Sequence, residues 1–198
     1  MINFYLPLTS QPRELDAKLF LALVAAERGH RAWIGYKTAY QSELYNLPQG
    51  IFLAHNARQK LKNIRVVSES GHYVLVLDEE ALVRQTDEIF LKKHPPNAFR
   101  YVSKILCWGQ DDYDMWKNYN LKGEFENEIV GNLRFDLLRP ELSNFYQEEI
   151  ATLKKRFGDF VLLNTNFPTI NNSTSVGGGV RLNKQSIDDR GRMIAENF

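Results

Sequence analysis

The sequence predicts an α/β protein built on a doubly wound, mostly parallel β-sheet with helices on both faces. Three observations lead to this prediction. Short apolar segments alternate with helical segments from residue 2 to residue 164. Several of these apolar segments have no polar interruption, as is typical of strands buried on both faces. Each strand candidate is followed by polar residues and then by a helix, which is the order of βαβ units. Right-handed crossovers would then place a functional crevice at the carboxyl ends of the strands.

Composition excludes several classes of protein. The chain has 198 residues, enough for one well-cored domain or two small ones. Its 43% hydrophobic and 25% charged residues indicate a folded chain rather than a disordered one. Lys and Arg number 25 against 24 Asp and Glu, so the basic excess of a dedicated nucleic-acid binder is missing. A single cysteine, Cys107, excludes an internal disulfide and a cysteine zinc cluster, and its apolar neighbours indicate a buried thiol.

The N-terminus does not resemble a secretory signal, because MINFYLPLTS has neither a basic region nor a small-residue cleavage site. The longest purely apolar run, Leu19 to Ala26, is far shorter than the roughly 20 residues of a membrane-spanning helix. We therefore expect a cytoplasmic protein without a transmembrane segment.

The first half of the chain has clear boundaries between its elements. Residues 2–8 form an aromatic and aliphatic strand candidate. A helix then begins at Pro12, which suits a first helical turn, and ends at Gly29. Its apolar residues recur at helical spacing. Two more strands are predicted, at residues 31–36 and 50–54. Between them we expect a short helix over residues 40–47, which Pro48 ends.

The second half repeats the alternation. The most apolar strand candidate is Tyr73–Leu77, which three acids follow. Gly158 ends a well-formed helical pattern that begins at Leu142. The remaining predictions are a surface helix over 57–70, strands at 105–108, 128–132 and 160–164, and a helix that begins near Gln110 and runs through Trp116.

The composition changes after residue 164. Residues 165–179 are rich in Asn, Thr, Ser and Gly, as linkers are. A helical pattern then starts at Asp188 and stops at Phe198 without a cap. We therefore expect a first domain over 1–167, a linker over 168–186, and the start of a second domain over 187–198. On this interpretation the chain is the N-terminal half of a longer protein.

The sequence contains no strong cofactor motif. No Gly-x-Gly-x-x-Gly follows the first strand, and no P-loop or Gly-x-Ser-x-Gly elbow is present. The four histidines have no metal-ligand spacing: His30, His55, His72 and His94. We expect neither a cofactor nor a metal site.

Polar clusters follow three of the predicted strands. The first contains Arg13, Glu14, Asp16 and Lys18. Helical geometry places Glu14 and Lys18 four residues apart on one face. They would form either a surface ion pair or a substrate-facing acid and base on the rim of the crevice.

The second cluster is Asp78, Glu79 and Glu80, at the end of the most apolar strand. Acids that repel one another beside low-dielectric walls can have raised pKa values suited to acid–base catalysis. The alternative is that Asp78 caps a helix whose first turn contains Glu79 and Glu80.

The third cluster follows Gly131. Gly131 and Asn132 suit a tight turn from strand to helix. Arg134 would either bind a phosphate or pair with Asp136.

Taken together, these segments resemble the bacterial surface carbohydrate biosynthesis protein family. The resemblance covers residues 1 to about 167, and its segments occur in the same order: 12–19, 26–30, 77–80, 107–109, 112–113, 131–140 and 163–167. The family looks like the glycosyltransferase B architecture, in which two Rossmann-like domains face each other across a cleft. Two positions depart from the family pattern. Leu133 stands where members usually carry Pro, and Ala81 where they usually carry Gly.

The resemblance implies a glycosyltransferase-like protein of bacterial surface polysaccharide biosynthesis. A nucleotide-sugar donor would bind mainly to a second domain, and a glycan or lipid-linked acceptor would bind to this one. The protein itself would lie at the periphery of the inner membrane. It implies a base or charge stabiliser among Asp78, Glu79 and Glu80. The expected substrate-binding residues are Arg13, Glu14, Asp16, Lys18, Asn132 and Arg134.

Three alternatives remain open: a nucleotide-sugar 2-epimerase, a polymer-forming phosphotransferase, and a non-catalytic domain that binds a glycan or a partner. We expect the isolated chain to be inactive, because sugar transfer requires donor and acceptor in one cleft.

Overall fold

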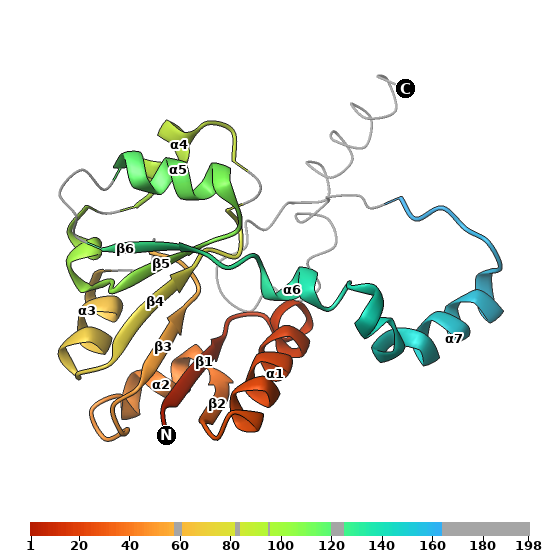
Figure 1. Ribbon diagram of the computed structural model, residues 1–198, viewed down its shortest axis with the longest axis horizontal. Coiled ribbons are helices and arrows are strands. Elements are labelled where there is room, and N and C mark those ends of the chain that lie inside the picture. The colour runs from red at the N-terminus through yellow and green to blue at the C-terminus, as the bar shows by residue number, and fades with distance from the viewer. Residues whose placement is uncertain (58–60, 82–83, 95, 120–124, 164–198) are drawn as a thin grey trace, which may run out of the picture. The chain divides into compact units, whose positions relative to one another are not determined.

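The predicted doubly wound, Rossmann-like sheet is confirmed. In the computed structural model, residues 1–163 are described except 58–60, 82–83, 95 and 120–124 (Figure 1). The chain divides into two compact units, Met1–Glu148 and Glu149–Phe198, and the first contains the sheet. The sheet has six strands, all parallel. The strands are β1 (Asn3–Leu8), β2 (Arg31–Tyr36), β3 (Ile51–Ala54), β4 (Tyr73–Leu77), β5 (Lys104–Cys107) and β6 (Glu126–Ile129).

The strand order, β2-β1-β3-β4-β5-β6, defines where a ligand site is expected. The chain leaves β1 toward β2, then crosses back, and all later strands add on the other side of β1. This is the flavodoxin-like 2-1-3-4-5 order extended by one strand, rather than the 3-2-1-4-5-6 order. The topological switch point therefore lies between β1 and β3, and ligands of such sheets bind outside the carboxyl ends of the strands.

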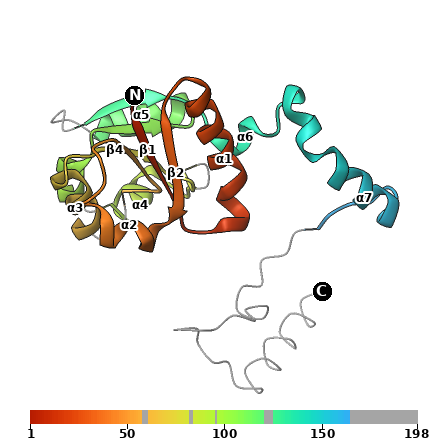
Figure 2. The same ribbon diagram turned by 90° about the horizontal axis from the view of Figure 1, so that it is seen from below.

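Helices cover both faces of the sheet (Figure 2). On one face, Leu6 and Leu53 pack with α1 and α6. The other face is covered by α2, α3, α4 and α5, over a larger core that includes Tyr5, Phe52 and Val74. The helices of this unit are α1 (Gln11–Glu27), α2 (Lys37–Glu43), α3 (Leu61–Glu69), α4 (Asp87–Leu91), α5 (Gln110–Tyr119) and α6 (Leu133–Asp136). Two 3₁₀ helices, Pro96–Tyr101 and Pro140–Tyr146, complete it.

An aromatic cluster forms the centre of the larger core. The Trp116 ring packs edge-on against Phe90, Phe99 and Phe125. Cys107 lies in the same core and is fully buried. This confirms the predicted buried thiol, and burial, with Asp112 nearby, raises the pKa of that thiol to about 12.

The described residues after 139 correct two predictions. The helix predicted over 142–157 is divided: the 3₁₀ helix Pro140–Tyr146 is followed by α7 (Gln147–Phe157), whose first residues belong to the first unit. The strand predicted over 160–164 is wrong, since residues 160–163 have no regular structure and Val161 is 96% exposed. A strand needs a hydrogen-bonded neighbour, and an apolar run cannot supply one by itself. Residue 164, the predicted linker and the predicted second domain lie outside the described residues.

Two elements were not predicted from the sequence, α4 and the 3₁₀ helix Pro96–Tyr101. Thr86 caps α4, because its hydroxyl accepts a hydrogen bond from the Ile89 amide.

Within the described residues, every helix is too short or too polar to cross a membrane.

Candidate functional site

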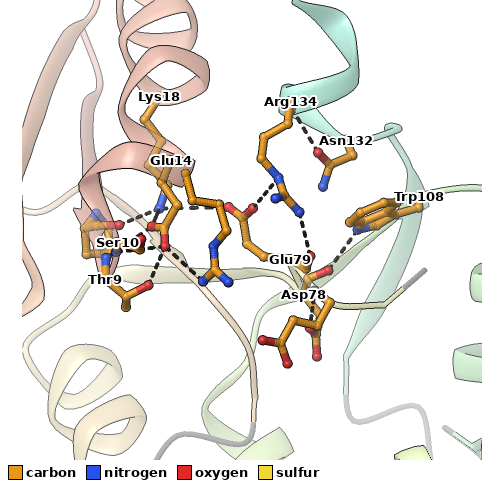
Figure 3. Close-up of polar contacts among 12 residues, drawn as sticks. Thr9, Ser10, Glu14, Lys18, Asp78, Glu79, Trp108, Asn132 and Arg134 are labelled. Atoms are coloured by element: carbon orange, nitrogen blue, oxygen red, sulfur yellow. Dashed lines mark hydrogen bonds and ion pairs between the residues drawn. The ribbon is translucent and has the colours of Figure 1, made fainter. Parts of the chain in front are cut away.

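The three polar clusters predicted from the sequence meet at the carboxyl ends of β1, β4 and β6 (Figure 3). Glu14 and Lys18 come from the first turns of α1, Glu79 from the loop after β4, and Arg134 from α6. Contacts between Lys18 and Glu79, and between Glu79 and Arg134, join the clusters into one ion-pair network.

Glu14 holds the loop between β1 and α1. Its carboxylate accepts hydrogen bonds from the amides of Thr9 and Ser10, each at 3.1 Å, and from the Thr9 hydroxyl. Ser10, at the helix N-cap, makes no side-chain cap of its own. The Glu14 side chain thus reaches back to the chain before the helix, as the glutamate of a capping box does.

Lys18 and Glu14 form a buried ion pair. The Lys18 ammonium lies 2.8 Å from Glu14 Oε2, donates to the Pro7 carbonyl at 2.5 Å, and lies 4.0 Å from Glu79 Oε1. The exposed fractions of the Lys18 and Glu14 side chains are 2% and 0%. The predicted pairing is confirmed, but it lies inside the protein rather than at its surface. Burial alone would raise the pKa of Glu14, but hydrogen bonds from Lys18 and Thr9 lower it to about 2.

Glu79 links β4 to α6. Its Oε2 lies 3.2 Å from Arg134 Nε, and its backbone carbonyl accepts a hydrogen bond of 2.9 Å from Arg134 Nη2. Of the two alternatives for Arg134, the pairing with Asp136 is wrong, because Asp136 pairs with Arg139 at 2.8 Å. Figure 3 shows the Glu79 carboxylate between Lys18 and Arg134. Glu79 therefore joins the first and third clusters through its two carboxylate oxygens.

Asp78 is not the cap of a helix, because Glu79, Glu80 and Ala81 form a turn rather than a first helical turn. It closes a tight turn, in which its Oδ1 accepts a hydrogen bond of 2.9 Å from the Glu80 amide. Its Oδ2 lies 3.6 Å from Nε2 of the buried His94. Its backbone carbonyl accepts a hydrogen bond of 2.8 Å from the indole of Trp108. The Asp78 side chain therefore stabilises the loop after β4 from inside.

Glu14, His55 and Glu79 offer one ligand atom each within 4.8 Å of one another. Lys18 already lies against both carboxylates, however, and supplies the positive charge that a metal would bring. Burial lowers the pKa of His55, although the neighbouring Glu14 and Glu79 oppose this. The arrangement is best described as an ion-pair network beside a neutral histidine.

A cleft of about 530 Å³ lies beside this network, over the ends of β5 and β6. Trp108 and Phe135 form an aromatic part of its lining, with ring centroids 5.7 Å apart. Arg84 and Arg139 contribute cations, and both are already paired with acids. Volume, aromatic surface and a few polar groups together match the general character of small-molecule sites.

Asn132 and Asp112 line the cleft, and each has one polar atom engaged and one unpartnered. Asn132 Oδ1 caps α6 by accepting from the Arg134 amide at 2.9 Å, while its Nδ2 has no hydrogen-bond partner. Asp112 Oδ2 accepts from the Trp108 amide at 3.0 Å, while its Oδ1 has none. Both side chains are at least 95% buried. The protein thus holds one unused donor and one unused acceptor, both buried, on residues that line the cleft.

The remaining predicted residues lie at the margin. Asp16 and Glu80 are exposed, and neither is among the residues that line the cleft. Arg13 keeps 40% of its side chain exposed and lies 3.4 Å from Glu14. The catalytic roles given to Asp78, Glu79 and Glu80, and the substrate contacts given to the other residues, stay predictions.

Sequence reasoning missed two residues of this region. His55 directly follows β3, so the strand-end rule that found Asp78 would also have found it. Asp112 lies in the first turn of α5, where an acid suggests only a favourable interaction with the helix dipole. Its carboxylate accepts a hydrogen bond from the Trp108 amide inside the protein, which no local pattern shows.

Comparison with known proteins gave no family model, no curated protein and no solved structure that matches the chain. A function for it therefore has to be inferred from the chemistry of its own residues.

Proposed function

We propose that this chain is the acceptor-binding part of a glycosyltransferase-like enzyme of bacterial surface polysaccharide biosynthesis. In this proposal the cleft between Trp108, Asp112 and Asn132 holds a sugar unit of the acceptor. A nucleotide-activated sugar would be bound by a further domain. The acceptor hydroxyl then attacks the anomeric carbon and loses its proton to the departing nucleotide phosphate or to water. The bond from that carbon to the nucleotide phosphate breaks as the new glycosidic bond forms.

The single observation that carries the proposal is the pair of unpartnered polar atoms in the cleft lining. Buried polar groups nearly always find hydrogen-bond partners, so Asn132 Nδ2 and Asp112 Oδ1 are best explained by a ligand. A sugar hydroxyl both donates and accepts, and therefore satisfies either atom. The apolar face of a sugar ring would pack on Trp108 and Phe135. The cleft also lies at the carboxyl edge of the sheet, where doubly wound folds bind ligands, although over β5 and β6 and not at the switch point between β1 and β3.

The ion-pair network supports the cleft from behind. Asn132 caps the helix that carries Arg134, and Arg134 is held by Glu79. Both carboxylate oxygens of Glu79 lie against cations, so we assign Glu79 the role of holding Arg134. About one third of the Arg134 side chain is exposed, which would suit contact with an anionic group of the acceptor.

A genetic complementation experiment tests the proposal. Deletion of the gene in the organism that encodes it should abolish or shorten a surface polysaccharide, and the intact gene should restore it. Genes carrying Asp112→Asn or Asn132→Asp should fail to restore it at equal protein levels. Asp114→Asn is the matched control, because Asp114 is an exposed acid on the same helix and is not among the residues that line the cleft.

Two results would overturn the proposal. One is an unchanged surface polysaccharide in the deletion strain. The other is conversion of a free nucleotide sugar by the complete enzyme without any acceptor, which would identify an epimerase instead.

A further inference from the structure

A second cavity, of about 290 Å³, lies on the opposite face of the sheet from α1. Its walls come from α2, α3, β3 and β4, and are formed mainly by hydrophobic side chains, among them Tyr40, Leu44, Phe52, Ile64, Val67 and Val74. Protein interiors have few voids larger than a water molecule. An engineered apolar cavity of roughly 150 Å³ stays dry and takes up benzene. The volume of this cavity is about twice that of the engineered one.

Of the described residues that line the cavity, Lys37 alone carries a charge. Its side chain is half-buried, and burial lowers the pKa of its ammonium group. No acid of the described residues lies within ion-pair distance of it. A cation beside an apolar cavity without a counter-ion is unfavourable, because desolvation costs free energy that no partner offsets.

The phenol of Tyr40 does not supply the missing partner. It donates a hydrogen bond of 2.5 Å to the Trp33 carbonyl, and burial raises its pKa to about 12, so it remains neutral. The cavity therefore combines an apolar body with one unmatched positive charge. A molecule with an apolar tail and one anionic head group satisfies both features at once.

We propose that this cavity binds a small anionic amphiphile, with its apolar tail among Phe52, Ile64 and Val67 and its carboxylate or phosphate head on Lys37. The site is separate from the cleft at Trp108 and does not depend on the proposed sugar transfer. The charge-assisted hydrogen bond to the head group selects an anion. Burial of the tail supplies most of the affinity, as apolar area is removed from water.

The experiment compares eight-carbon probes on the full chain by isothermal titration calorimetry and thermal melting. Octanoate and octyl phosphate should bind and raise the melting temperature, and the tighter of the two identifies the head group. Octan-1-ol, which has the same tail without a charge, should bind at least about tenfold more weakly, the equivalent of one charge-assisted contact.

Three variants separate the charge from the cavity. Lys37→Met should weaken binding of the anionic probes by about tenfold and leave that of octan-1-ol unchanged. Val67→Phe, which fills the cavity, should abolish binding of every probe. Lys117→Met is the control, since Lys117 is exposed on α5 and is not among the residues that line the cavity. It should bind like the parent.

Methyl NMR spectra of the parent chain provide a second measurement that needs no variant. Octanoate should shift the signals of Leu44, Ile64, Val67 and Val74 and leave those of Leu133 unchanged. The proposal is overturned if the anionic probes do not bind, if octan-1-ol binds as tightly as octanoate, if Lys37→Met binds the anions like the parent, or if the shifts appear at the Trp108 cleft.

Discussion

Lys18 and Glu14 face each other across one turn of α1 at 2.8 Å, with 2% and 0% of their side chains exposed. Lys92 and Glu88 have the same spacing and a similar distance, 2.6 Å, but 70% and 76% of their side chains are exposed. The same sequence pattern therefore occurs in two different dielectric environments. Buried pairs are costly to break, whereas exposed pairs contribute little.

Lys18→Met should lower the free energy of unfolding by about 3–5 kcal/mol, because it leaves the Glu14 carboxylate buried without its counter-ion. Adding Glu14→Gln removes that charge and keeps an acceptor for the Thr9 and Ser10 amides, so more than half of the loss should be recovered. Urea denaturation of the two single variants and the double variant gives the coupling free energy.

The exposed pair supplies the control for this cycle. Lys92→Met should change the free energy of unfolding by less than about 0.5 kcal/mol. If Lys18→Met has an equally small effect, the ion-pair network does not exist in solution as described.

Acid should destabilise the protein through Glu14. Its pKa in the folded state, about 2, lies below the ordinary value of 4.5. The unfolded chain therefore takes up the proton first, and the stability that Glu14 contributes is complete above pH 4.5 and is lost as the pH falls toward 2. The loss should amount to about 3 kcal/mol.

Urea unfolding at about pH 5 and about pH 3 measures this dependence. The Glu14→Gln variant should be less stable than the parent at the higher pH and should lose less stability between the two. An equal loss in parent and variant would mean that other carboxylates cause the acid sensitivity.

The sheet was predictable from sequence because its strands carry local signals. The run Tyr73–Leu77 is apolar throughout, and the structure confirms β4 with the same bounds. The helix that Pro12 and Gly29 delimit is also confirmed, within one or two residues, as α1. The run at Phe160–Leu163 is equally apolar but forms no strand. Apolar character shows that a segment favours a strand, but not whether a partner strand is available.

Burial at the candidate site was not predictable for the same reason. Glu14 and Glu79 are charged residues just beyond strand ends, and such residues are usually exposed. Their burial requires Lys18 and Arg134, which come from α1 and from α6, more than 100 residues apart in sequence. Only the folded chain brings these four side chains together.

The turn before α6 should depend on Gly131. Its φ of +81° is one that side-chain-bearing residues rarely adopt, and no atom lies within 4 Å of the place of a Cβ. Gly131→Ala should therefore destabilise by about 1 kcal/mol through backbone strain alone. Gly109, which lines the same cleft, has equal space and no positive φ. Gly109→Ala should be close to neutral, and equal losses in the two variants would contradict this account of the turn.

Asp112→Asn should make the protein at least as stable as the parent at neutral pH. Burial raises the pKa of Asp112 above its ordinary 3.8, so its ionised form is disfavoured in the folded state. The free-energy cost of ionising buried Asp112 therefore lowers the stability of the folded protein as the pH rises above 3.8. Asparagine removes this cost, and its amide oxygen keeps the hydrogen bond from the Trp108 amide. Thermal melts at about pH 7 and about pH 3 should show the advantage only at the higher pH. A lower melting temperature at neutral pH would contradict the assignment.

If the cleft at Trp108, Asp112 and Asn132 holds an acceptor sugar as we propose, an NMR titration of the full chain should detect the binding at these residues. The probe is an oligosaccharide prepared from the surface polysaccharide of the organism. We predict shifts of the Trp108 indole and of the Asn132 side-chain amide, with affinity about tenfold weaker in Asp112→Asn and in Asn132→Asp and unchanged in Asp114→Asn. Shifts confined to other parts of the chain, or equal affinity in all four proteins, would contradict the claim.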